Sequence, residues 1–257
     1  MKDKIVLITG GSSGIGKATA EKFVSAGAQV IIAARNLEKG NRVAKEIGAT
    51  FIQADVGRLA DIEALIRSVI DMFGRLDIAV NNAGTPKGGG KPLFEFDEAE
   101  FDEVIDVNLK GVWGCMKYEI AQMLDQEPAG GAIVNVASVN ALGGSQNGSI
   151  YSASKAGVLA LTKSAAQEFA EEGIRVNVLA AGAYETPMLN AVVTRSVGDD
   201  AEAIASAKER FSGVIPMGRI GNPNEAAEVI SWLCSDQASY VTGHTMIADG
   251  GLTADTR

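Results

Sequence analysis

The sequence predicts an α/β fold: a doubly wound, seven-stranded parallel sheet with helices on both faces, in a single domain. Short apolar runs alternate with longer segments of helical period along the whole chain. No linker, repeat or shift of composition divides the 257 residues, of which 46% are apolar and 21% charged. Because single α/β domains commonly reach this length, we expect one domain with a sizeable core.

Seven apolar runs are predicted as strands. They are nearly continuous rather than alternating, which is typical of strands buried on both faces. The runs cover residues 5–8, 30–34, 50–52, 78–80, 132–136, 174–179 and 245–248. Strands that alternate with helices are joined by right-handed crossovers, so the sheet is parallel and its ligands bind at the carboxyl ends of the strands.

The segments between the runs carry helical patterns. The clearest is an apolar stripe closed by a helix-ending glycine, formed by Ile62, Leu65, Ile66, Val69, Ile70, Phe73 and Gly74. Between the last two runs, residues 184–215 interrupt the alternation with a helical stretch that contains methionine and alanine. We expect this stretch to form a lid that sets substrate choice.

Composition excludes several classes of partner. Thirty-two acidic and 23 basic residues give a net charge of −9, which repels nucleic acid and anionic membrane surfaces. The chain has no uncharged apolar stretch of about 18 residues and no signal-peptide pattern. Two cysteines are too few for a disulfide framework, and the single histidine, His244, removes most metal sites. We expect a cytoplasmic protein without metal, nucleic-acid or membrane partners.

A glycine-rich turn follows the first predicted strand directly and leads into a helix. It reads Thr9-Gly10-Gly11-Ser12-Ser13-Gly14-Ile15-Gly16, with the spacing G-x-x-x-G-x-G. Glycines let backbone N–H groups approach a pyrophosphate, and a helix N-terminus attracts the anion. The alternative is a glycine-rich helix entry without ligand, which the position after a buried strand disfavours. The turn therefore predicts a Rossmann-like nucleotide site.

With this turn, the sequence resembles the short-chain dehydrogenase/reductase family over essentially its whole length. The further matches are Asp55-Val56, Asn81-Asn82-Ala83-Gly84, Asn108, Ser138, Tyr151-x-x-x-Lys155 and Asp249-Gly250-Gly251. The resemblance implies that Asp55 binds the adenine amino group, that Asn82, Ala83 and Gly84 line the ribose region, and that Thr186 reaches the carboxamide side. The expected cofactor residues are, in full, Gly10, Ser12, Ser13, Gly14, Ile15, Gly16, Arg35, Asp55, Val56, Asn82, Ala83, Gly84, Tyr151, Lys155, Gly182, Tyr184 and Thr186.

The resemblance also implies a homotetramer. Its contacts would come from the helices around residues 98–124 and 151–171 and, at a second interface, from the C-terminal strand. The chain departs from the family after the sixth strand, where the usual Pro-Gly is replaced by Ala181-Gly182. Gly182 and Thr186 are kept, so cofactor binding is still expected; the missing proline leaves the stiffness of the backbone and the placement of the nicotinamide open.

The end of the second predicted strand bears on the choice of cofactor. A carboxylate about 20 residues past the glycines would bind the ribose 2′-hydroxyl of NAD, whereas an arginine accommodates the 2′-phosphate of NADP. Ala34 stands where that acid is expected, and Arg35 follows it. The Arg35 guanidinium can pair with a phosphate, and Ser12 offers a second contact. We expect NADP (NADPH) to be preferred, with NAD as a possible cofactor; the alternative is a solvated arginine.

Four residues form the expected catalytic set: Asn108, Ser138, Tyr151 and Lys155. Tyr151 and Lys155 are four apart, hence on one face of a helix that begins near Ser149. A cation beside the phenol lowers the tyrosine pKa from about 10, which makes the pair an acid/base device. Ser138 follows the fifth apolar run, and the resemblance implies that its hydroxyl hydrogen-bonds the substrate oxygen. The alternative is a serine that caps a helix or turn. The resemblance assigns Asn108, expected in mid-helix, a water-linked proton relay with Lys155.

Together these features predict an NADP-dependent oxidoreductase that interconverts a secondary alcohol and a ketone by hydride transfer, with Tyr151 as acid/base. A cyclic or partly apolar substrate is suggested by the apolar residues near the lid, Met188, Leu189, Val192, Val193, Phe211 and Met217. One alternative is a 3-oxoacyl reductase of fatty-acid synthesis, although a charge of −9 steers poorly toward an acidic carrier protein. The other is a non-catalytic NADP-binding regulator, which has no chemical need of all four catalytic residues.

Overall fold

The structure, a computed structural model, describes residues 1–254 and contains one seven-stranded parallel sheet. Its strands are β1 (Ile5–Thr9), β2 (Gln29–Ala34), β3 (Thr50–Gln53), β4 (Ile78–Asn81), β5 (Gly131–Ser138), β6 (Ile174–Ala181) and β7 (Thr245–Ala248). The spatial order is β3-β2-β1-β4-β5-β6-β7, and each predicted apolar run lies within one strand. The predicted fold class is therefore confirmed.

The sequence signal for the end of one helix is confirmed. Gly74 closes the helix Leu59–Phe73 in the left-handed conformation, with a φ of 76°, as the apolar stripe predicts. The α-helices are α1 (Gly14–Ser25), α2 (Leu37–Ile47), α3 (Leu59–Phe73), α4 (Glu98–Ile105), α5 (Gly111–Asp125), α6 (Asn140–Gly143), α7 (Ser149–Phe169), α8 (Pro187–Val197), α9 (Ala201–Gly213) and α10 (Pro223–Cys234). Shorter turns are the 3₁₀ helices η1 (Leu93–Glu95) and η3 (Asp236–Ala238) and the π-helical turn η2 (Asp106–Lys110). Within residues 1–254, no helix combines the length and the apolar character that crossing a membrane requires.

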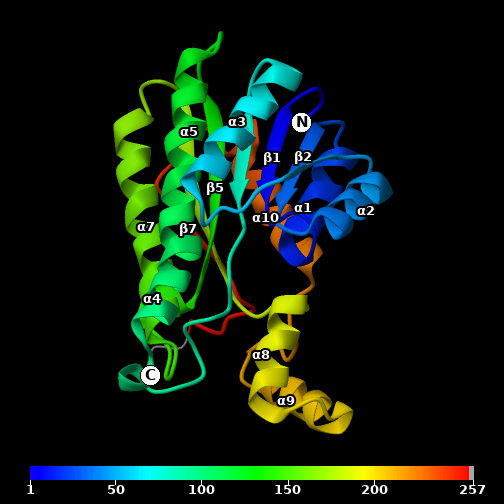
Figure 1. Ribbon diagram of the computed structural model, residues 1–257, viewed down its shortest axis with the longest axis vertical. Coiled ribbons are helices and arrows are strands. Elements are labelled where there is room, and N and C mark those ends of the chain that lie inside the picture. Colours follow the sequence, from blue (N-terminus) through cyan, green and yellow to red (C-terminus); the bar gives the residue numbers. More distant parts are fainter. Residues whose placement is uncertain (255–257) are drawn as a thin grey trace.

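Two layers of helices cover the sheet, one on each face (Figure 1). Leu7 of β1 packs among residues of α3, α5 and α7. Its neighbours Val6 and Ile8 point the other way and pack among residues of α1, α2 and α10. Because both faces of the central strands are buried, successive residues all meet apolar surroundings, which explains the continuous apolar runs.

The direction of the strand order reverses between β1 and β4, which are neighbours in the sheet. At such a switch point the connections leave toward opposite faces and open a crevice at the carboxyl ends of the strands. Helices α8 and α9 occupy most of the segment 184–215 and project beyond this end of the sheet (Figure 1). A ligand site is thus framed by the sheet edge and these two helices.

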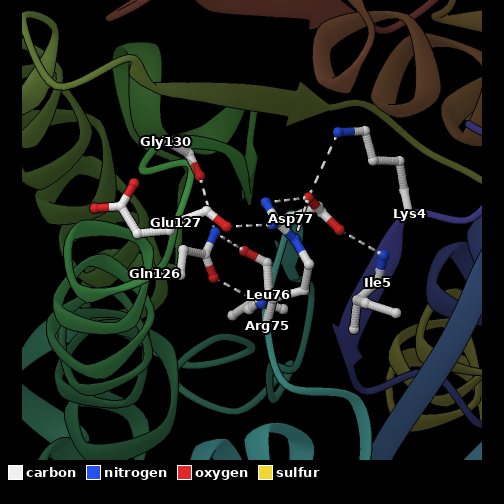
Figure 2. A network of polar contacts seen from close by, with 8 residues as sticks. All are labelled: Lys4, Ile5, Arg75, Leu76, Asp77, Gln126, Glu127 and Gly130. Carbon is white, nitrogen blue, oxygen red and sulfur yellow. Dashed lines mark hydrogen bonds and ion pairs between the residues drawn. The ribbon is translucent and has the colours of Figure 1, made fainter.

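A polar network fixes the opposite, amino-terminal end of the sheet (Figure 2). The buried carboxylate of Asp77 accepts hydrogen bonds from the Ile5 backbone N–H at 2.9 Å and from Arg75 Nε at 3.0 Å. The Gln126 side chain accepts from the Leu76 N–H and donates to the Leu76 carbonyl, both at 2.9 Å. These contacts join the start of β1, the α3–β4 turn and the α5–β5 turn. The end of the sheet opposite the crevice is therefore stabilised by the hydrogen bonds of Asp77 and Gln126.

Candidate active site

A cavity of about 840 Å³ opens at the carboxyl ends of the strands and runs from the end of β2 to α8 and α9. Every cofactor and catalytic residue expected from the sequence lines this cavity except Gly16 and Asn108. Gly16 lies behind the glycine turn, where an added Cβ would meet the Gly10 carbonyl. Asn108 is fully buried behind the wall. These two residues support the site from behind.

The glycine-rich turn has the conformation that a phosphate cradle needs. Gly10 and Gly14 have φ values of 66° and 55°, in the left-handed region that favours glycine. A Cβ on Gly10 would lie 2.8 Å from Asn82 Nδ2, so a larger residue would displace the loop after β4. Ser13 begins α1 without a side-chain cap, and no acidic residue lies in the first turn. The first N–H groups of α1 are therefore open to an anion such as a pyrophosphate.

Asn82 braces this turn as well as lining the cavity. Its Nδ2 donates to the carbonyls of Thr9 at 3.1 Å and Gly10 at 3.2 Å. The N–H of Ala83 donates to Thr9 Oγ1, also at 3.2 Å. These bonds join β1 to the loop after β4 at the switch point. Asn82 therefore has a structural role that the sequence did not predict.

Two basic residues lie where β2 runs into α2. Arg35 and Lys39 both line the cavity, and their backbones are fixed because Gln53 donates to the Arg35 carbonyl and Asn36 accepts from the Lys39 N–H, each at 2.8 Å. Among the described residues, Asp55 is the one acid in the cavity wall. Sequence reasoning missed Lys39, and the signal for it was its place one helical turn beyond Arg35.

Tyr151 and Lys155 lie one turn apart on α7, and both line the cavity. Lys155 Nζ lies 6.0 Å from the centre of the Tyr151 ring and donates to the Val136 carbonyl at 3.0 Å. Burial lowers the pKa of Lys155 to about 8. Burial raises the pKa of Tyr151, and the neighbouring Ser138 hydroxyl offsets part of that rise.

The net change in the Tyr151 pKa is therefore a rise, whereas the sequence predicts a net lowering by Lys155. Removing the phenolate from water disfavours it, and this effect outweighs the hydrogen bond from Ser138. The Lys155 ammonium is held against the Val136 carbonyl. The phenol therefore keeps its proton at neutral pH. A protonated phenol is the form that can act as the acid in ketone reduction.

Ser138 is the last residue of β5 and lines the cavity with Tyr151. Its Oγ accepts the N–H of Asn140 at 3.2 Å, at the start of α6. The alternative of a serine that caps a turn is thus partly right. Because this contact uses a lone pair of the oxygen, the hydroxyl proton can be donated either to the Tyr151 oxygen or to a ligand beside it.

Asn108 lies in mid-helix as expected, but in the π-helical turn η2 through which α4 continues into α5. Such turns are rare and frequently occur at functional sites. Its Oδ1 accepts the Thr85 N–H at 2.8 Å, and its Nδ2 donates to the Thr85 carbonyl at 3.0 Å. A Cβ on Gly84 would lie 3.2 Å from Asn108 Oδ1 and 3.4 Å from Lys155 Nζ. Asn108 therefore holds the loop after β4 beside the lysine.

Thr186 lies opposite the glycine turn, at the start of α8. Its Oγ1 accepts the Leu189 N–H at 3.2 Å and so caps the helix. A Cβ on Gly14 would lie 3.1 Å from Thr186 Cγ2. The glycine-rich turn and the turn after β6 therefore lie close to each other across a narrow part of the cavity.

The other residues expected after β6 have structural contacts. The Tyr184 hydroxyl donates to the Ala248 carbonyl at 3.0 Å, so its proton is not offered to a ligand. Gly182 packs against Asp249, where a Cβ would lie 2.6 Å from the Asp249 Cα. Ala181, which replaces the family's proline, is the last residue of β6 and pairs with Ser138 in register.

The remaining end of the cavity is lined by α8, α9 and neighbouring loops. Four of the apolar residues expected near the lid line the cavity, namely Met188, Leu189, Val192 and Phe211. The other two do not, because Val193 is buried in the fold and Met217 is exposed outside the cavity. Sequence reasoning missed Arg195 of α8 in this wall. An arginine on an exposed helix face gives no signal of its own, because such residues are usually only solvated.

The wall fits a nicotinamide dinucleotide. The uncapped start of α1 suits a pyrophosphate, and glycine at position 84 leaves open the space beside Lys155 Nζ that a Cβ would enter. Arg35 and Lys39 offer positive charge at one end. The described part of the chain contains no group of three or more histidine, cysteine, aspartate or glutamate side chains placed to hold a metal.

Comparison with known proteins agrees with this geometry. The family model described as enoyl-(acyl carrier protein) reductase matches residues 10–253. The 2,5-dichloro-2,5-cyclohexadiene-1,4-diol dehydrogenase of Sphingobium indicum is 39% identical over 99% of this chain and 98% of its own. The 3-oxoacyl-[acyl-carrier-protein] reductase of Thermotoga maritima is 39% identical over 98% of both chains. A solved actinorhodin polyketide ketoreductase with NADPH superposes with a TM-score of 0.91, at 34% identity over 98% of this chain and 99% of its own.

Proposed function

The chain belongs to the short-chain dehydrogenase/reductase family, and on that premise we propose that it reduces a cyclic, partly apolar ketone with NADPH and oxidises the corresponding alcohol in reverse. Its relatives act on CH–OH and C=O groups, and the chain is an oxidoreductase of that kind. The observation that carries the proposal is one continuous cavity in which Ser138, Tyr151 and Lys155 lie between a basic end and an apolar wall.

The mechanism follows from the protonation states and hydrogen bonds of the site. The bound cofactor supplies the hydride in reduction and accepts it in oxidation. Ser138 donates a hydrogen bond to the substrate oxygen, and Tyr151 gives that oxygen its proton as negative charge develops there. The Lys155 ammonium stabilises the phenolate that remains. Asn108 keeps the loop at Thr85 in place beside the lysine.

The preference for NADPH is supported by the basic end of the cavity. Arg35 and Lys39 line it together, and Ala34 leaves no carboxylate for a ribose 2′-hydroxyl. A guanidinium pairs well with a phosphate, and a lysine at the first turn of α2 adds a second positive charge. The polyketide ketoreductase of the same fold was solved with NADPH. NAD would lack the 2′-phosphate that these cations suit.

A 3-oxoacyl reductase is the second candidate, because the relative from Thermotoga maritima carries that activity in its name. Such an enzyme must dock an acidic carrier protein, whereas this chain has a net charge of −9. We therefore rank it below a free cyclic ketone. Reduction of a 3-oxoacyl thioester in preference to every cyclic ketone would reverse that order.

We further propose a homotetramer in the cytoplasm. Trp113 of α5 and Ile247 of β7 expose 41% and 45% of their surface, on the two regions expected to form the interfaces. Cys115 and Cys234 are both free and buried, which suits a reducing compartment. Light scattering on purified protein checks the assembly, and a monomeric mass would overturn it.

The experiment that tests the proposal is a fluorescence titration with NADPH and NADH, followed by a panel of cyclic and linear ketones with the tighter complex. We expect NADPH to bind at least about tenfold more tightly and cyclic ketones to drive its oxidation. Tight binding without turnover of any ketone would favour the regulator. Preference for NADH would contradict the part assigned to Arg35.

A further inference from the structure

The cavity wall carries a charge opposite to that of the whole chain. Within the part of the chain that the structure describes, four cations line it, namely Arg35, Lys39, Lys155 and Arg195, against the single acid Asp55. Among residues 1–254, none of these four forms an ion pair within 4.0 Å. In a chain with net charge −9, this concentration of unpaired positive charge favours anionic ligands.

Three of the four cations have a part in the proposed function. Arg35 and Lys39 lie at the end of β2 and suit the cofactor phosphate, and Lys155 lies beside Tyr151. Arg195 belongs to α8, on the substrate side of the cavity. Nearby cations do have carboxylate partners: Lys87 pairs with Glu103 and Lys208 with Glu185. The charge of Arg195 is thus not assigned to cofactor, proton transfer or fold.

The side chain of Arg195 reaches the loop that supports the catalytic tyrosine. Its Nη1 contacts the Pro86 carbonyl at a long 3.5 Å, and its Cδ lies 3.8 Å from where a Gly90 Cβ would stand. In the same loop, the Gly88 carbonyl accepts the Tyr151 N–H at 3.2 Å. One weak contact leaves most of the guanidinium's five N–H donors for a ligand at this end of the cavity.

The surroundings of Arg195 define the rest of the ligand. Met188, Leu189 and Val192 lie on the same helix and Phe211 on α9, and all four line the cavity. One arginine balances a single negative charge, and its guanidinium fork matches two carboxylate oxygens, so the ligand that best fits this arginine and its apolar wall is a carboxylate on a hydrocarbon body. A phosphate dianion would keep a surplus charge in this part of the cavity.

We propose that Arg195 binds a carboxylate of the substrate, so that the protein interconverts a cyclic keto acid and the corresponding hydroxy acid. This inference rests on the proposed function and narrows its substrate class. The carboxylate passes through the reaction unchanged: the carbonyl carbon gains hydride from the reduced cofactor, and the carbonyl oxygen gains the proton of Tyr151. Arg195 is a substrate-binding residue that favours acids over neutral ketones of the same shape.

The test compares 3-oxocyclohexanecarboxylate with its uncharged methyl ester in the wild type, Arg195→Gln, Arg195→Lys and Arg210→Gln. Arg210 is an exposed arginine of α9 that does not line the cavity, so its variant controls for loss of one positive charge. We expect Arg195→Gln to lower kcat/KM for the acid about 10- to 100-fold, mainly by raising KM. The kcat/KM for the ester should change by less than about twofold. Arg195→Lys should restore part of the loss.

A binding measurement separates this inference from the proposed function. Calorimetry on the protein–NADPH complex compares cyclohexanecarboxylate, cyclohexanecarboxamide and cyclohexyl phosphate. The inference is supported if the carboxylate binds selectively and its binding weakens at least about tenfold in Arg195→Gln. This holds even if no ketone is reduced, because absence of ketone reduction would contradict the proposed function and not the carboxylate site. Equal binding of acid and amide, tighter binding of the phosphate, or an equal fall for acid and ester in the kinetic test would overturn it.

Discussion

At the residue scale, activity depends on the protonation of two side chains of α7. Burial raises the pKa of Tyr151, so the phenol is the acid, and lowers the pKa of Lys155 to about 8, so its charge is lost just above neutral pH. In ketone reduction the Lys155 ammonium stabilises the phenolate that forms. Loss of its proton should therefore slow that direction as pH rises.

This argument predicts the pH profile of reduction. We expect kcat/KM to stay level below pH 8 and to fall above it, by about tenfold for each further pH unit, when it is measured between pH 6 and 10 with saturating NADPH. Lys163→Met, which changes an exposed lysine of the same helix, should keep the profile. A rate that stays level to pH 10 would show that the Lys155 charge is not required.

Cofactor choice is also decided by single residues. Arg35→Asp places a carboxylate where the 2′-phosphate is expected, so the Kd of NADPH should rise about 10- to 100-fold while NADH binding improves. Arg42→Asp makes the same change of charge at an exposed position of α2 outside the cavity, and both affinities should stay within about threefold of the wild type. Similar losses in the two variants would indicate a general charge effect.

At the element scale, α5 carries a carboxyl group into the core. Glu119 is fully buried, Asn81 of β4 donates to its Oε2 at 2.9 Å, and its Oε1 has no hydrogen-bond partner among the described residues. Burial raises the pKa of Glu119 to about 7 from its ordinary value of 4.5. The folded state therefore holds this proton more tightly than the unfolded state, and the fold loses stability as pH rises from about 4.5 to about 7.

The variant Glu119→Gln, which cannot ionise, should remove this loss. We expect it to exceed the wild type in free energy of unfolding by up to about 3 kcal/mol at pH 8 and to match it near pH 4.5, in urea titrations at both values. Asp125→Asn, at the exposed end of the same helix, should show no such difference. Equal stability of Glu119→Gln and the wild type at pH 8 would mean that the buried carboxylate is solvated or paired.

The network of Figure 2 makes a separate prediction for the amino ends of the strands. Asp77→Ala leaves the buried Ile5 N–H without its acceptor and removes the carboxylate partner of Arg75, which keeps only the Glu127 carbonyl, so the free energy of unfolding should fall by about 2–3 kcal/mol. The exposed Asp71→Ala on α3 is the matched control. Because the network lies at the end opposite the cavity, KM values should not change in either variant; a raised KM would show that the two ends of the sheet are coupled.

At the scale of the whole molecule, the sheet could be predicted because the sequence patterns that indicate its strands and helices are local. Seven continuous apolar runs, the stripe that ends at Gly74 and the glycine turn each depend on neighbouring residues alone. The placement of most site residues followed, because carboxyl ends of parallel strands share one edge of the sheet. The predicted and observed strands therefore agree along the chain.

The features that escaped prediction arise from contacts between distant segments. The direction of the Tyr151 pKa shift depends on burial, and the side chain of Asn108, in its π-helical turn, is bonded to the distant Thr85. Lys39 and Arg195 enter the cavity wall only through the way α2 and α8 meet the sheet. A sequence pattern fixes the face on which a residue lies, but not its solvation or its distant neighbours.

The central claim is that one cavity binds the cofactor and uses Tyr151 for the chemistry. The most direct measurement sets NADPH titration and ketone-dependent NADPH oxidation side by side for the wild type and Tyr151→Phe. The account predicts Kd values within about threefold of each other and a fall in kcat of about 10²- to 10⁴-fold, because only the acidic proton is lost. Turnover by Tyr151→Phe at the rate of the wild type would contradict it.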